Sequence, residues 1–171
     1  RWPIIGRQVP SFEMNYSPDQ PAEVSMDKWD GYPLAQEAFN RTLAAADRPP
    51  LTLAGDAHAH FAAQRRKVDN NKEFGADIVC TSVSSGGDGQ DTDDRWPILK
   101  ANNPDIQYHS KRRGYVLVDV SGSDIAADFR TIDKISTIDH RLHSSAKIHL
   151  DSRGILTTEQ SQILIRDKSA S

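Results

Sequence analysis

The sequence predicts an α/β protein in which a layered α/β unit continues into an antiparallel β-meander. In the first half of the chain, short apolar runs bounded by glycine or proline alternate with a segment of helical spacing. After residue 106 a strand–turn–strand pattern dominates instead. The 171 residues are enough for one domain with a core, and no internal repeat divides them.

The first elements are a strand and a helix. A short β-type run covers residues 2–9, and a polar loop containing prolines follows it as far as Met26. Pro33 opens the helix, because proline at the first helical position loses no needed hydrogen bond. Arg48-Pro49-Pro50 ends it. Residues at helical spacing predict one buried stripe, made of Ala35, Ala38, Phe39, Thr42, Leu43 and Ala46.

The middle of the chain reads as strand, helix, strand. Residues 51–54 form a short buried strand that Gly55 ends, and residues 57–67 are expected to turn into a helix. The small Ala62 and Ala63 and the basic run at 65–67 suggest that helix. The remaining elements of this half are a strand over 74–83, a glycine-rich loop over 84–94 and a brief helical turn over 96–99.

The second half is predicted to be a hairpin with one more strand. Residues 115–120 alternate as a strand, 121–123 make a turn and 125–132 return. A further strand is expected over 146–150. We therefore place residues 1–150 in the domain and residues 151–171 in a tail, because chain ends usually fray.

Composition and charge exclude several classes of protein. The net charge is −3 with both signs interspersed, so the basic footprint of a nucleic-acid binder is missing. The single cysteine, Cys80, excludes an internal disulfide framework. No window approaches the ~18 apolar residues of a transmembrane span. The apolar fraction of 37% is below the usual ~45–50%, which suggests a thin core, long exposed loops, or surface normally covered by more protein.

The strongest chemical signal is Gly55-Asp56-Ala57-His58-Ala59-His60, directly after a short apolar strand. Ligands of open α/β sheets bind at the carboxyl ends of strands. An aspartate supplies a hard oxygen ligand, and a neutral imidazole suits iron or zinc. If the segment stays extended, its three ionisable residues face one side. The alternative is that one histidine is packed and hydrogen-bonded while the other is solvated.

Two further segments are candidates for phosphate contact. Residues 81–89 combine hydroxyls and glycines after a strand, which suits either an anion-binding nest of backbone N–H groups or a plain connecting loop. Arg112 and Arg113 offer planar forks that match phosphate oxygens, although a charged turn before a strand would look the same.

These segments, in this order, resemble the C-terminal region of PhoD-like alkaline phosphatases. The resemblance spans nearly residues 1–133 and is carried by segments 2–9, 27–33, 55–60, 81–89, 112–115 and 127–130. It implies a metallophosphoesterase-type layered α/β sandwich as the fold. It also implies an enzyme that hydrolyses phosphomonoesters, and in some members diesters, with calcium and iron. It also implies export through the twin-arginine route, and hence a secreted or periplasmic protein.

The resemblance also implies roles for particular residues. Asp56 takes the place of the first metal ligand and would bind calcium, and His58 takes the second and would bind iron. His60 is a catalytic candidate, either supporting the ligands or donating a hydrogen bond to the phosphoryl group. The mechanism would be two-metal hydrolysis of a phosphate ester.

One departure from the family matters for activity. The N-terminal half, with its earlier metal ligands, does not match any part of this chain, which begins at Arg1 without a signal peptide. Two or three ligands cannot fill both coordination shells, so residues 1–171 alone are expected to be inactive without that partner half. The alternatives are a catalytically silent module that binds a metal or partner, and an amidohydrolase, whose barrel also opens with Asp-x-His-x-His.

Overall fold

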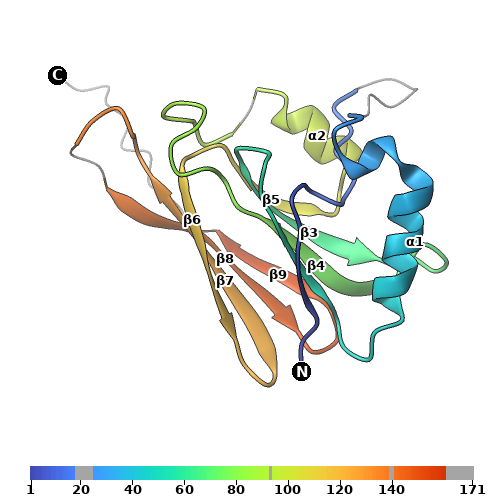
Figure 1. Ribbon diagram of the computed structural model, residues 1–171. Helices are drawn as coiled ribbons and strands as arrows, with labels where there is room; N and C mark the ends of the chain where they lie inside the picture. The colour runs from blue at the N-terminus through green and yellow to red at the C-terminus, as the bar shows by residue number, and fades with distance from the viewer. Residues whose placement is uncertain (18–24, 93, 139–140, 161–171) are drawn as a thin grey trace.

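The computed structural model describes residues 1–17, 25–92, 94–138 and 141–160. Two β-sheets pack face to face, and helices cover the outer face of one of them, so the molecule has three layers (Figure 1). This architecture confirms the predicted α/β class with a β-meander.

One sheet, which we call the mixed sheet, holds the first five strands in the order β1-β2-β4-β3-β5. Strands β1, β2 and β4 are parallel, whereas β3 runs antiparallel to both β4 and β5. The strands are β1 (Ile4–Gly6), β2 (Leu51–Ala54), β3 (His60–Arg66), β4 (Glu73–Val79) and β5 (Ile106–Ser110). The carboxyl ends of β2 and β4 therefore meet at one edge, next to the start of β3.

The other sheet, the antiparallel sheet, is a meander in the order β6-β7-β8-β9. Its strands are β6 (Gly114–Val120), β7 (Asp124–Ile132), β8 (Leu142–Asp151) and β9 (Leu156–Gln160). The predicted hairpin is confirmed by β6 and β7, and the strand expected over 146–150 lies inside β8. The sheet continues past the boundary placed at residue 150, because β9 pairs with β8. Residues 161–171 lie outside the described residues.

The helices are short. The α1 helix (Pro33–Ala44) begins at the predicted proline, preceded by a 3-10 turn, η1 (Trp29–Gly31), whose Trp29 packs against Phe39 with ring centroids 5.2 Å apart. The α2 helix (Trp96–Asn102) extends the predicted turn. Within the described ranges, no helix has the length and apolar character that a membrane crossing requires.

The prediction of a helix over 57–67 was wrong, because residues 60–66 form β3. Phe61 packs toward α2, while Ala62 joins the core between the two sheets. A strand buried on both faces shows no alternation of polar and apolar residues, and its alanines favour a helix when read locally. Pairing with β4 and β5 overrides that local preference.

Two apolar cores hold the layers together. The first lies between the sheets and includes Leu51 and Ile78 from the mixed sheet and Phe129 and Ile148 from the antiparallel sheet. The second lies on the opposite face of the mixed sheet, where Phe61 packs with Leu99 of α2 and Met14 of the N-terminal segment. Both faces of β3 and β4 are thereby covered, which fixes the loops at their ends.

Candidate active site

The candidate site lies in three loops at the end of the mixed sheet where strands β2 and β4 finish. Residues 55–59 connect β2 to β3, residues 80–92 follow β4, and residues 111–113 join β5 to β6. These loops gather at the upper end of the sheets in the view of Figure 1. Because β2 and β4 are parallel neighbours, residues following both strands come together, as ligand sites in open α/β sheets require.

The backbone of the loop after β2 is unusual. Asp56 and His58 have φ values of 68° and 48°, in the left-handed region that non-glycine residues rarely occupy. Such conformations cost about 1–3 kcal/mol each and concentrate at functional sites. Both side chains belong to exposed residues. The loop therefore turns instead of staying extended, and it presents a carboxylate and an imidazole to solvent.

His60 does not share that exposure. It is 0% exposed, and its Nδ1 atom accepts a hydrogen bond of 3.4 Å from the backbone N–H of Thr81. Its ring meets Phe129 edge to face with centroids 5.2 Å apart. Burial, together with the positive charge of Arg113, lowers the pKa of His60 to about 3. His60 is therefore a neutral, packed histidine that joins the start of β3 to the loop after β4.

The glycine-rich loop after β4 approaches His58. Gly86, Gly87 and Gly89 all have positive φ. A Cβ atom added at Gly86 would lie 3.1 Å from Nη1 of Arg113 and 3.9 Å from Nδ1 of His58, whereas one added at Gly87 would meet no atom within 4 Å. The absence of a side chain at Gly86 therefore leaves room for the imidazole and the guanidinium to lie against the loop.

This difference gives a matched pair of substitutions. Gly86→Ala and Gly87→Ala share the cost of placing alanine at positive φ, about 1–2 kcal/mol, but only the first crowds the Arg113 guanidinium, which contacts the same loop as His58. We expect Gly86→Ala to lower kcat/KM at least about 10-fold below Gly87→Ala, because small displacements of catalytic groups are costly. Steady-state kinetics of the full-length protein, with the phosphate ester that the sequence resemblance implies as substrate, measures the ratio, and equal values would show that the contact at Gly86 does not affect activity.

The two arginines are held by different partners. Arg112 donates to both carboxylate oxygens of Asp91 and, at 3.1 Å, to the backbone carbonyl of Asp133. The hydrogen-bonded ion pair with Asp91 raises the pKa of Arg112. Arg113 is 1% exposed and donates to oxygens of His58, Ser82, Ser85 and Lys111. Both guanidinium groups are thus engaged within the protein, and their contact with substrate stays a prediction.

The donor set fits a cation, although it is incomplete. Asp56 offers a hard carboxylate oxygen and His58 an imidazole nitrogen, which together suit a site that mixes a hard cation with a transition metal. In the part of the chain that the structure describes, no three His, Cys, Asp or Glu side chains gather closely enough to hold a metal ion. The two residues could therefore contribute ligands but could not complete a coordination shell.

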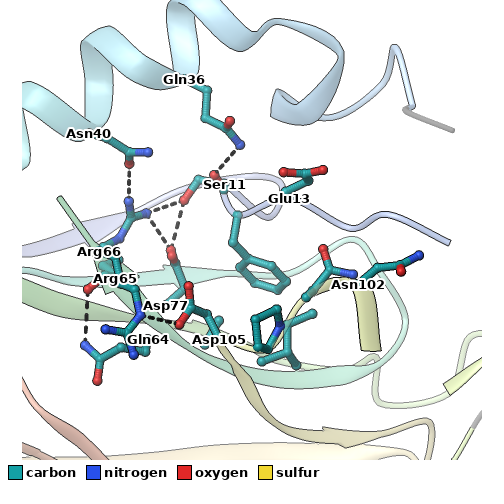
Figure 2. Close-up of a pocket in the computed structure, with 15 residues that line it drawn as sticks. Ser11, Glu13, Gln36, Asn40, Gln64, Arg65, Arg66, Asp77, Asn102 and Asp105 are labelled. Carbon is teal, nitrogen blue, oxygen red and sulfur yellow. Dashed lines mark hydrogen bonds and ion pairs between the residues drawn. The ribbon is translucent and has the colours of Figure 1, made fainter. Parts of the chain in front are cut away.

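A polar cavity of about 350 Å³ lies elsewhere, between α1, α2 and the mixed sheet (Figure 2). Both arginines that line it are engaged: Arg65 contacts Asp77 at 2.6 Å and Asn40 at 2.5 Å, and Arg66 contacts Asp105 at 2.6 Å. Sequence reasoning missed this network, since a basic run at 65–67 gives no sign that Arg65 is buried. None of the site residues predicted from the sequence lines the cavity.

Comparisons with known proteins agree with this fold. The chain matches a family model described as PhoD-like phosphatase over residues 1–129, a range that includes every candidate site residue. Alkaline phosphatase D of Bacillus subtilis (strain 168) is 34% identical over 136 residues, which are 77% of this chain and 23% of the relative. A solved structure described as "Structure of PhoD" is 27% identical with a TM-score of 0.89, covering 95% of this chain and 32% of that chain.

Proposed function

The chain belongs to the PhoD-like phosphatase family, and on that premise we propose that it forms part of a phosphoesterase that hydrolyses phosphomonoesters at a two-metal site. The observation that carries the proposal is the loop after β2, where Asp56 and His58 are exposed together on a strained backbone. Strained backbone conformations of this kind cluster at active sites and ligand-binding positions. The neighbouring loops after β4 and β5 close the same edge of the sheet.

Each side chain has a proposed task. Asp56 would hold calcium through its carboxylate, and His58 would hold iron through its imidazole. When bound, the cations orient the phosphate ester, activate water and offset charge on the attacking and leaving oxygens. The burial of His60 favours a supporting role over contact with the phosphoryl group. Arg112 would add positive charge at the edge of the site while Asp91 holds it in place.

The chain spans 23% of the length of the alkaline phosphatase D that it matches. Calcium alone takes about 6–8 oxygen ligands, so we propose that the remaining ligands come from a further part of the same catalytic domain, outside residues 1–171. The relative's family supports a secreted or periplasmic location as part of the same proposal. A silent metal-binding module remains the second candidate, because two ligands could retain a cation without turnover.

Removal of metal tests this proposal. In the full-length product of the gene, we expect a chelator to lower p-nitrophenyl phosphate turnover at least about 100-fold, because cations supply most of the charge stabilisation. Adding calcium and iron together should restore the rate. Turnover that persists after chelation, with the metals shown to be gone by elemental analysis, would contradict a metal-dependent site. Metal retained without any turnover would favour the silent module instead.

A further inference from the structure

Arg113 occupies an unusual position between the two sheets. It directly precedes β6, where the chain passes from the mixed sheet to the antiparallel sheet, and its side chain is among the largest that are fully buried. The preceding residue behaves differently, since Arg112 is partly exposed and paired with Asp91. The sequence predicts a phosphate fork at both arginines, whereas the structure buries one and not the other.

The contacts of Arg113 join three loops. Its Nη1 atom donates to Ser82 Oγ at 2.6 Å and to the backbone carbonyl of Ser85. Its Nη2 atom donates to the backbone carbonyl of His58 at 2.8 Å and to that of Lys111. One side chain therefore connects the loop after β2, the loop after β4 and the loop after β5, which are the three that form the candidate site.

These contacts occupy every donor on the two terminal nitrogens of Arg113. Each terminal nitrogen carries two N–H groups, and each makes two hydrogen bonds to the protein. The remaining donor, Nε, is buried without a partner among the described residues. A phosphate could reach Arg113 only by breaking the bonds that hold the loops. The geometry of Arg113 therefore suits a residue that holds protein loops together and not one that binds a phosphate.

The charge of Arg113 also has no close counterpart. All its acceptors are neutral, and no carboxylate in the described ranges forms an ion pair with it. Buried Arg65, in contrast, is paired with Asp77. A buried guanidinium held by neutral acceptors alone is costly, and it lies where the backbone of His58 is already strained at a φ of 48°.

We propose that Arg113 is a positioning residue that fixes the backbone carbonyl of His58 and thereby sets the direction of the His58 imidazole. The role rests on the proposed function of His58 as a metal ligand. Through Ser82 and Ser85 the same guanidinium holds the glycine-rich loop, so that Gly86 stays against both the guanidinium and the imidazole. Arg113 thus acts through His58 without touching the substrate.

The test compares Arg113→Lys with Arg41→Lys, an exposed arginine on α1. Lysine keeps the charge, but its single ammonium cannot span acceptors in three loops. Without metal or substrate, we expect amide hydrogen exchange over residues 57–60 and 82–87 to be at least about 10-fold faster in Arg113→Lys and unchanged in Arg41→Lys. With saturating metal, kcat of the full-length protein should fall at least about 10-fold while KM changes less than about 3-fold.

Ser82→Ala provides a milder variant if Arg113→Lys does not fold, because it removes one acceptor and leaves the guanidinium in place. It should speed exchange in the same two segments by a smaller factor. Unchanged exchange in the variant that folds would overturn the proposal, and so would a large rise in KM with kcat intact, which indicates direct phosphate contact. The exchange measurement needs no activity, so a wild-type protein without turnover would count only against the proposed function.

Discussion

Asp56→Asn is expected to lower kcat/KM for p-nitrophenyl phosphate at least about 100-fold in the full-length protein. The substitution keeps the size of the side chain but removes the charge that a hard cation requires, and even residues that only support metal ligands cost about 10–100-fold when changed. Asparagine also tolerates the left-handed backbone at this position, where φ is 68°. The loss should therefore come from the ligand and not from the loop.

Asp119→Asn is the matched control, because Asp119 is an exposed aspartate on β6, outside the three loops of the candidate site. It should retain wild-type kinetics. His58→Ala should cause a loss comparable to that of Asp56→Asn and should lower the iron content measured by elemental analysis. If Asp56→Asn keeps both its turnover and its affinity for calcium, Asp56 is not a ligand.

Asp77→Asn is expected to have the largest effect on stability, a loss of about 3–5 kcal/mol in the free energy of unfolding. Removing one partner of a buried ion pair leaves an uncompensated charge, which typically costs that much. Asp77 accepts hydrogen bonds from Arg65 and Ser11 (Figure 2) and another from Thr52. Both side chains of the Arg65–Asp77 pair are only 4% exposed. The Asp77 charge also counters a second cation, Arg7, whose pKa is lowered chiefly by burial.

Glu37→Gln serves as the control for this prediction, since it also removes the acidic partner of an arginine. Glu37 and Arg41 lie one turn apart on the exposed side of α1, where solvent weakens the interaction. Denaturant unfolding followed by circular dichroism should show a lowered midpoint for Asp77→Asn and the wild-type midpoint for Glu37→Gln. Similar midpoints in both variants would mean that the Asp77 network does not stabilise the fold.

The sequence was informative where one face of an element is buried and the other is wet. The hairpin of β6 and β7 shows clear alternation, and Pro33 marks the first turn of α1, so both elements were predicted correctly. The stripe predicted on α1 was wrong in part, because Leu43 is buried and Phe39 half-buried whereas Ala35, Ala38, Thr42 and Ala46 are exposed. The strand β3 is buried on both faces and carries alanines beside arginines, which makes it look like a helix. No local pattern shows that β4 and β5 lie on either side of it.

The sequence indicated where the candidate site lies along the chain, but it did not predict how the side chains there are directed. The position of Asp56 and His58 after an apolar strand was visible, but equal spacing suggested that His60 faces the same way. Left-handed backbone at 56 and 58 turns the loop, and His60 enters the core instead. Arg112 and Arg113 looked equivalent because adjacent residues share their local context. Only the meeting of three distant loops distinguishes them.

The most direct test is a crystal structure of the full-length protein, grown with calcium and iron, with anomalous data collected at the iron absorption edge. The account predicts an iron peak within about 2.5 Å of an imidazole nitrogen of His58, and an Asp56 carboxylate oxygen within about 2.6 Å of a calcium ion. A map that places every metal away from the loop between β2 and β3, with His58 and Asp56 directed into solvent, would contradict it.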